Sequence, residues 1–182
     1  MTGVFVLSPT DRAFLSAARS ATLATIAPGG RPRLVPICFV VGGVEPGHST
    51  RIYSPIDEKP KTATEPTALA RVRDLLARPR ASILAERWSE DWSELGWLRL
   101  DVTGDVLAPG EADDAERAIA IERLRAKYPQ YAGHHLEDLP LLRFVVTRVT
   151  GWRAGLSDPG TAHRRAAADS ASSSSPGGSP RR

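Results

Sequence analysis

The chain has 182 residues, of which 41% are hydrophobic, and its formal net charge is +3. This length suits one domain with its own hydrophobic core and argues against two domains. Residues 156–182 hold four arginines and two aspartates, so only +1 of the net charge belongs to residues 1–155. A nearly neutral body lacks the broad basic field that holds a nucleic-acid backbone. We therefore expect no nucleic-acid partner.

The sequence offers no membrane segment and no disulfide framework. No apolar run approaches the roughly 20 residues that span a bilayer, and residues 1–7 lack the basic and apolar regions of a signal peptide. A single cysteine, Cys38, excludes an intramolecular disulfide and a zinc site built from several cysteines. These features predict a cytoplasmic protein in a reducing compartment, with no membrane partner.

The first predicted elements are a helix and a hairpin. Ser8 is a candidate N-cap, Pro9 occupies the tolerated first helical position, and Asp11 lies near the positive end of the helix dipole. Residues 21–26 and 33–41 then form two apolar runs on either side of a Pro-Gly-Gly turn, a pattern that predicts an antiparallel hairpin.

Strands dominate the rest of the chain. Helical spacing and proline stops predict two further helices, and alternating or β-branched runs predict strands. The predicted helices are 67–78 and 111–128, and the predicted strands are 51–56, 81–86, 95–107 and 141–152. We therefore expect a mainly β protein, an antiparallel Greek-key-type barrel with a few covering helices. Residues 1–155 form this domain, and residues 156–182, rich in serine, glycine and arginine, form a disordered tail.

Two lysines follow the third predicted strand. The run that begins at Arg51 stops at Pro55, and Lys59 and Lys61 come next, separated by Pro60. Proline ends regular pairing and stiffens the chain. Two ammonium groups at a strand-to-helix junction suit a phosphorylated ligand, although an exposed pair of lysines is also typical of a solvated surface loop.

Several segments, in this order, resemble a known family. They are residues 21–25 with the turn at 29–32, then 33–39, 56–61, 75–84, 90–92 and 151–154. The chain resembles the pyridoxamine-phosphate-oxidase-like proteins, which are FMN-binding split β-barrels. The Asp-x-Lys-Pro-Lys element with the downstream Asp-Trp resembles the coenzyme F420-dependent branch most. The resemblance implies a homodimer with the cofactor in a groove between two barrels.

The resemblance also implies which residues bind the cofactor. They are Lys59, Lys61, Ser54, Thr22, Thr25, Arg33, Pro36, Ile37 and Trp92. The lysines would hold the phosphate, and Ser54 would lie near the ribityl-phosphate arm. The ring would be lined by Thr22, Thr25, Pro36 and Ile37. Trp92 would cover the site from its own or the partner subunit. F420 carries a polyglutamate tail, for which Arg31, Arg33 and Arg51 are candidate ligands.

The expected function is an F420-dependent oxidoreductase that moves a hydride between reduced deazaflavin and a small organic acceptor. Such a cofactor carries its own hydride chemistry, so no acid–base dyad is required of the protein. Two alternatives remain: an FMN-dependent enzyme of the same family, and a non-catalytic carrier of flavin, F420 or haem.

The other residues that could bind a metal, act as a nucleophile or contact a ligand are better explained by structural roles. The adjacent His134 and His135 favour a polar loop over a metal site, because they would point to opposite sides of an extended segment. Cys38 lies in a predicted strand, and we expect it to be a buried, inert thiol. Trp88, Trp92 and Trp97 suit either packing or ligand contact, and Trp152 favours packing.

Overall fold

The computed structural model describes residues 4–56, 69–110, 113–155 and 164–165. Its helices are α1 (Pro9–Ala17), α2 (Ala70–Ala77) and α3 (Asp114–Lys127), with short 3-10 turns η2 (Trp92–Glu94), η3 (Pro129–Gly133) and η4 (Leu136–Asp138). The strands are β1 (Ala21–Ile26), β2 (Pro32–Ile37), β3 (Val40–Val41), β4 (Arg51–Pro55), β5 (Arg80–Arg87), β6 (Gly96–Leu107), β7 (Leu141–Arg153) and β8 (Arg164–Arg165).

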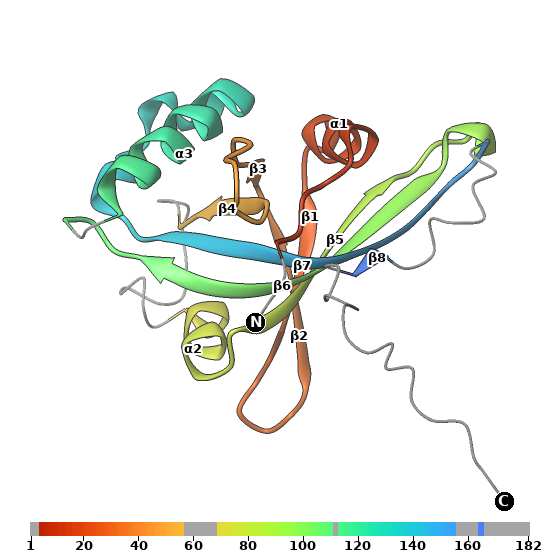
Figure 1. The fold of residues 1–182 in the computed structure, drawn as a ribbon. Coiled ribbons are helices and arrows are strands. Elements are labelled where there is room, and N and C mark those ends of the chain that lie inside the picture. Colours follow the sequence, from red (N-terminus) through yellow and green to blue (C-terminus); the bar gives the residue numbers. More distant parts are fainter. Residues whose placement is uncertain (1–3, 57–68, 111–112, 156–163, 166–182) are drawn as a thin grey trace, which may run out of the picture.

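The strands form one curled antiparallel sheet in the order β2-β1-β5-β6-β7-β4-β3, with β8 paired to β7 (Figure 1). The two longest strands, β6 and β7, cross the middle of the sheet, and their register shifts between Asp101 and Val102. Such a bulge bends a strand and increases its twist. Helices α1 and α2 cover open sides of this curled sheet, where Leu15, Val72 and Leu75 join the main core, and α3 packs against β3 and β4. The fold is a split β-barrel, which confirms the mainly β prediction.

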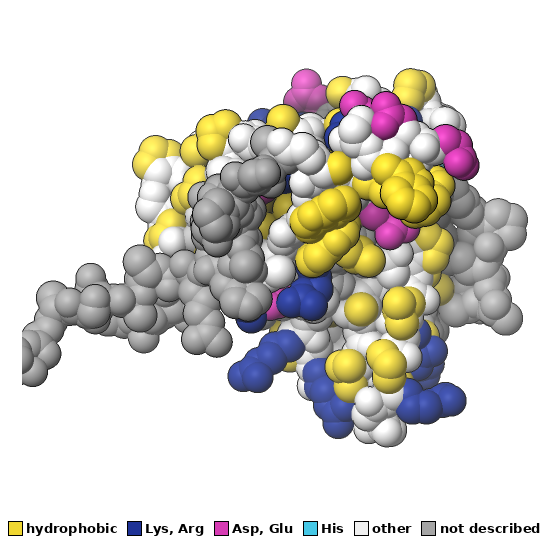
Figure 2. All heavy atoms as spheres, turned by 90° about the vertical axis from the view of Figure 1, so that its right-hand side faces the viewer, with side chains coloured by type: hydrophobic (Ala, Val, Ile, Leu, Met, Phe, Trp, Pro, Cys, Tyr) yellow, Lys and Arg dark blue, Asp and Glu magenta, His cyan; other side chains and the backbone are white. Residues whose placement is uncertain are grey.

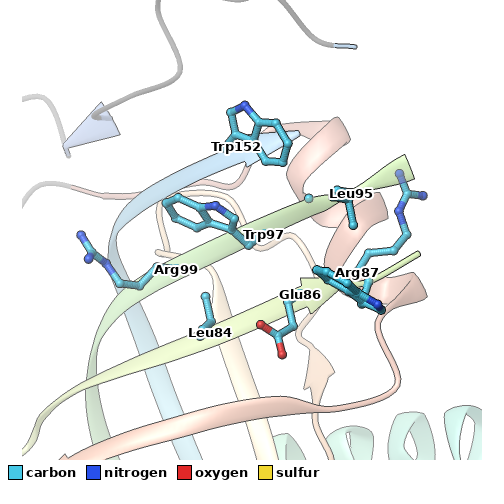
Figure 3. A pocket seen from close by; sticks show the side chains of 9 residues that line it. Leu84, Glu86, Arg87, Leu95, Trp97, Arg99 and Trp152 are labelled. Atoms are coloured by element: carbon cyan, nitrogen blue, oxygen red, sulfur yellow. The ribbon is translucent and has the colours of Figure 1, made fainter. Parts of the chain in front are cut away.

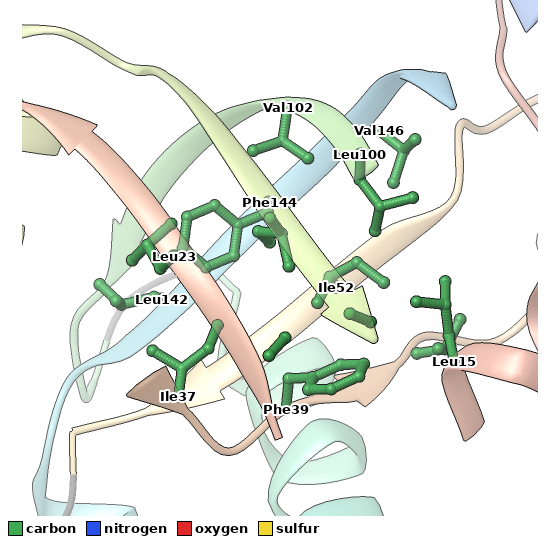
Figure 4. Close-up of a cluster of buried hydrophobic side chains, with 14 of the residues drawn as sticks. Leu15, Leu23, Ile37, Phe39, Ile52, Leu100, Val102, Leu142, Phe144 and Val146 are labelled. Atoms are coloured by element: carbon green, nitrogen blue, oxygen red, sulfur yellow. The ribbon is translucent and has the colours of Figure 1, made fainter. Parts of the chain in front are cut away.

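The inner face of the sheet encloses the main hydrophobic core (Figure 4). Figure 4 shows Leu23, Ile52, Leu100 and Phe144 converging from four strands, with Phe39 beneath them. Each of these five side chains is fully buried. A second cluster packs α3 against β3 and β4 through residues that include Ile121, Leu124 and Tyr128. The alternation predicted for β1 and β6 follows from this arrangement, because one face of each strand contacts the core.

The predicted helix start at Ser8 is confirmed. The Ser8 hydroxyl accepts a hydrogen bond from the Asp11 N–H at 3.1 Å and donates one to the Asp11 carboxylate at 2.7 Å. Asp11 does more than complement the helix dipole, because its other oxygen accepts a hydrogen bond from Arg153 at 2.7 Å. This buried contact joins α1 to the end of β7.

The strand predicted over residues 33–41 is wrong in its length. It divides into β2, which pairs with β1, and β3, which pairs with β4. Between them the Phe39 backbone bonds to a side chain, because the Tyr128 hydroxyl accepts from its N–H and donates to its carbonyl. A side chain that is distant in the sequence thus takes the place of a neighbouring strand as the hydrogen-bond partner of Phe39.

The C-terminal region contributes one short strand to the described part of the chain. Residues 164–165 pair with Arg148 and Val149 of β7. The rest of the segment predicted to be a disordered tail lies outside the described residues, so that prediction stays untested. Among the helices that the structure describes, none is long and apolar enough to span a bilayer.

Candidate functional site

A continuous row of side chains crosses the outer face of the sheet. Thr22 of β1 lies opposite Pro36 of β2 on one side and Leu84 of β5 on the other. Leu84 lies opposite Arg99 of β6, which lies opposite Thr150 of β7. Directly paired residues point to the same face of a sheet. Two of the predicted cofactor-binding residues, Thr22 and Pro36, are therefore brought together on this outer row.

One end of the same face forms a pocket of about 580 Å³. Its lining residues are Leu84, Glu86, Arg87, Trp88, Leu95, Gly96, Trp97, Arg99 and Trp152. Figure 3 shows Trp97 and Trp152 side by side on β6 and β7, where they are direct cross-strand partners. Trp152 is 51% exposed. Exposed, flat indole surfaces beside leucine form a wall that suits a planar ring.

The polar groups near this wall have spare hydrogen-bonding capacity. The Thr150 Oγ1 atom is buried and makes no hydrogen bond within the described part of the chain. An unsatisfied buried hydroxyl costs free energy that a ligand can recover. The Arg99 guanidinium contacts the Asp101 carboxylate only loosely, at 3.7 Å. The outer row thus combines an apolar surface with donors, a combination that fits a flavin-type ring.

Three other predicted residues face the core. Thr25, Ile37 and Ser54 are all buried, with at most 6% of each residue exposed. The Thr25 hydroxyl donates a hydrogen bond to Asp74 of α2 at 2.8 Å. Their side chains therefore lie on the opposite face of the sheet from Thr22 and Pro36.

Arg33 is the direct cross-strand partner of Thr25, so it lies on the same face as Thr25, half-buried beside the β1–β2 turn. Its Nε donates to the Asp74 Oδ2 atom at 2.8 Å, the oxygen that also accepts from Thr25. Asp74 is almost completely buried, so this contact fixes the guanidinium against α2. Sequence reasoning missed Asp74, whose only signal was a carboxylate within an otherwise cationic helix.

Of the remaining predicted residues, only Trp92 lies in the described part of the chain. Trp92 begins η2 and is 73% exposed, and it does not line the pocket. Lys59 and Lys61 lie outside the described residues. The described chain stops at Ile56, whose N–H donates to the Pro140 carbonyl, and resumes at Leu69, before α2.

The pocket also changes the interpretation of Trp152, which sequence reasoning assigned to packing. It lines the pocket with half of its surface exposed. Leu84 and Arg99 were missed because each is ordinary in a strand, and only the cross-strand register places them beside Thr22.

The sequence profile of the pyridoxamine 5'-phosphate oxidase family matches residues 7–153. The chain belongs to this family of flavin-binding split barrels. No sequence among the curated proteins matches the chain.

Solved structures share the fold at low sequence identity. A conserved hypothetical protein from Mycobacterium tuberculosis matches with a TM-score of 0.60 and 19% identity, over 83% of this chain and 88% of that one. A protein described as an F420 reductase matches with a TM-score of 0.52 and 16% identity, over 76% and 94% of the two chains. The haem storage protein HutZ from Vibrio cholerae matches with a TM-score of 0.54 and 16% identity, over 83% and 96%. At these identities the likeness establishes the fold and leaves the cofactor open.

Proposed function

We propose that the protein is an F420-dependent oxidoreductase that transfers a hydride between reduced deazaflavin and a small organic acceptor. The observation that carries this proposal is the outer row, which joins Thr22 and Pro36 to the aromatic pocket within a flavin-binding fold. The choice of F420 is supported by the Lys59–Lys61 element and by one structural neighbour described as an F420 reductase.

In this proposal the outer face holds the tricyclic ring. Thr22, Pro36 and Leu84 provide the surface on which the ring lies, and the hydroxyl of Thr150 bonds to its polar edge. Trp97 and Trp152 exclude water from the end of the ring. The bound deazaflavin supplies the hydride chemistry, so the protein needs only to bind, orient and desolvate. Lys59 and Lys61 neutralise the anionic arm.

The site is completed by a second copy of the chain. Large hydrophobic side chains remain exposed on the outer face, among them Leu34, Trp88 and Trp152. A contiguous exposed apolar patch is typical of an interaction surface. Packing two outer faces together covers these side chains and forms a groove for the cofactor between the subunits, with acceptor entering from the pocket end.

The first experiment compares F420 with FMN as ligands. Purified protein is titrated with each, and binding is followed by the change in cofactor fluorescence. We expect F420 to bind with a dissociation constant of tens of micromolar or lower, about 6 kcal/mol or more of binding free energy, and the Lys59→Ala/Lys61→Ala variant to bind it at least tenfold more weakly. Tight binding of FMN with no binding of F420 would replace the proposal with the FMN-dependent alternative.

A second experiment separates an enzyme from a carrier. Reduced F420 is mixed with the protein and a panel of nitroaromatic, quinone and enone acceptors, and cofactor oxidation is followed by absorbance. We expect turnover with at least one acceptor, and loss of turnover in a Thr22→Lys variant that obstructs the ring surface. Stoichiometric binding without turnover on the whole panel would favour the carrier. The haem storage neighbour is a protein of the same fold that is described as having a storage role.

A further inference from the structure

Most of the tryptophan in the chain surrounds the pocket at the end of the outer face. The chain has four tryptophans, and three of them, Trp88, Trp97 and Trp152, line this pocket of about 580 Å³. Trp88 is 76% exposed and Trp152 is 51% exposed, so both offer indole surface to a ligand. Figure 2 views the molecule from the side where β5 and β6 meet, and it shows a group of hydrophobic side chains with acidic side chains beside them.

The carboxylate of Glu86 belongs to the same wall. Glu86 is the direct cross-strand partner of Trp97, which pairs in turn with Trp152. All three side chains therefore point to the outer face of the sheet. Glu86 is exposed, and its carboxylate forms no hydrogen bond or ion pair with any residue that the structure describes. Its negative charge is available to a ligand.

The two arginines of the pocket are directed to other carboxylates. The Arg87 Nε atom donates to the Glu94 carbonyl at 2.6 Å, and its Nη1 atom lies 3.4 Å from the Glu94 carboxylate. The Arg99 Nε atom lies 3.7 Å from the Asp101 carboxylate. Figure 3 shows Glu86 between these two arginines, whose guanidinium groups lie at opposite ends of the pocket. Among the described residues, Glu86 is the charged group of the pocket that lacks a counter-charge.

Indole faces beside an unpaired carboxylate suit an organic cation. The face of tryptophan attracts a cation more strongly than that of tyrosine or phenylalanine, and groups of aromatic faces recognise quaternary ammonium ligands. A planar, delocalised cation gains this attraction and also stacks on the rings. Subunit packing alone explains the pocket less well, because it would bury the Glu86 carboxylate without a counter-charge, at a cost in free energy.

We propose that this pocket binds a planar organic cation of the N-alkylated heteroaromatic class, with Glu86 as its counter-charge and Trp97 and Trp152 as its aromatic wall. The binding site stands on the pocket itself. The role of the cation rests on the proposed function, because we assign the cation as the hydride acceptor, which adds a substrate class to that function.

The transfer balances in atoms and charge. A C–H bond forms on an electron-poor carbon of the acceptor ring as a C–H bond of the reduced deazaflavin breaks. The electron pair of the hydride neutralises the positive charge of the acceptor, and one proton passes from the oxidised cofactor to the solvent. The neutral product has no attraction to the Glu86 carboxylate, so the loss of charge favours its release.

The first test measures cation binding without a cofactor. N-methylquinolinium and neutral quinoline have similar shapes and differ in charge, and isothermal titration calorimetry gives the dissociation constant of each. We expect the wild type to bind N-methylquinolinium about tenfold more tightly than quinoline or better, and Glu86→Gln to reduce this preference to about threefold or less. Glu122→Gln removes an exposed carboxylate of α3 and is the matched control, with the wild-type preference expected.

A second pair of variants tests the aromatic wall. Trp152→Leu keeps an apolar side chain and removes the indole face, so it should weaken N-methylquinolinium about three- to tenfold. Trp92→Leu is the matched control for this titration, because Trp92 is exposed and does not line the pocket, and it should bind the cation as the wild type does. Glu86 and Trp152 are both exposed, so these replacements should leave the melting temperature nearly unchanged.

A third test connects the pocket to turnover. Reduced F420 is mixed with the protein and either N-methylacridinium, a planar cation that accepts a hydride, or a neutral quinone. Cofactor oxidation is followed by absorbance, and the uncatalysed rate is subtracted. We expect Glu86→Gln to raise the KM for N-methylacridinium about tenfold and to leave its kcat and the KM for the quinone nearly unchanged, because Glu86 contributes to binding and not to the chemical step.

The outcomes separate this inference from the proposed function. Failure to bind F420 and FMN contradicts the proposed function, and the quinolinium titration is independent of that result. Equal affinity of the wild type for N-methylquinolinium and quinoline contradicts the cation site, and so does an equal preference in the wild type and Glu86→Gln. Reduction of the quinone without reduction of N-methylacridinium contradicts the role of the cation as acceptor.

Discussion

The hydroxyl of Tyr128 bonds to both backbone groups of Phe39: it accepts from the N–H at 3.0 Å and donates to the carbonyl at 2.9 Å. Tyr128 is the C-cap residue that follows α3, and Phe39 lies between β2 and β3. This contact satisfies the backbone at the point where the chain leaves one side of the barrel for the other. It also places Phe39 in the core.

Replacing Tyr128 with phenylalanine should therefore destabilise the fold. The change removes one hydroxyl and leaves a buried N–H and a buried carbonyl without partners, which costs about 1–3 kcal/mol. Urea denaturation followed by circular dichroism measures the effect. An unchanged unfolding midpoint would show that the Phe39 backbone finds other partners.

The Asp11–Arg153 contact should be more important for stability than the helix cap beside it. Both side chains are largely buried, and their atoms lie 2.7 Å apart. Removing one partner of such a pair leaves a buried charge, at a cost of about 3–5 kcal/mol. Loss of a serine N-cap costs only about 1 kcal/mol. We expect Asp11→Ala to lower the free energy of unfolding more than Ser8→Ala does, and equal effects in chemical denaturation would contradict the importance of the pair.

Lys127 should make stability depend on pH in the alkaline range. Burial lowers the pKa of this ammonium group to about 8, and repulsion from Arg19 contributes to the shift. The same group in the unfolded chain titrates near 10.5. Between these values the unfolded chain binds more protons, so the Lys127 contribution to the free energy of unfolding should rise with pH, and below about pH 8 it should be constant.

The sequence contains only three lysines, which makes this prediction simple to check. After reductive methylation with a carbon-13 label, one lysine methyl signal should titrate near pH 8, in addition to that of the α-amino group, and it should be absent from a Lys127→Met variant. The variant should also lack the alkaline rise in stability. Titration of all three signals near pH 10.5 would contradict the burial of Lys127.

The outer face should mediate dimerisation. Leu34 is 65% exposed on this face, and Ile119 of α3 is similarly exposed elsewhere, at 55%. We expect a dimer at micromolar concentration, with Leu34→Glu shifting the molecular mass toward that of the monomer and Ile119→Glu leaving it unchanged. Light scattering after size exclusion measures both. A monomeric wild type would contradict a groove shared between subunits.

The strand pattern was predictable because most strands have one buried face. The alternation in β1 and β6 matches their burial, and these strands were predicted with nearly correct bounds. The break between β2 and β3 was not predictable, because it depends on Tyr128, which lies 89 positions away in the sequence.

The candidate site was predicted only in part, for a reason that strand geometry explains. Thr22 and Thr25 are three positions apart on β1, and Pro36 and Ile37 are adjacent on β2, so each pair must face opposite sides of the sheet. Family resemblance placed all four beside the ring. For Ser54, an alternation of buried and exposed residues could not indicate the face, because β4 is buried on both faces. The roles of Leu84 and Asp74 depend on pairing between strands and on contact with α2, which a single sequence does not reveal.

The most direct test of the central claim is a cofactor titration of the wild type beside a variant of the outer row. Leu84→Arg places a charge at the centre of that row, and Ile119→Arg is the matched control on α3. We predict that F420 binds the wild type and Ile119→Arg with dissociation constants of tens of micromolar or lower, and that Leu84→Arg binds at least tenfold more weakly. Equal binding by all three proteins, or no binding of either F420 or FMN by the wild type, would contradict the assignment of the outer face as the cofactor site.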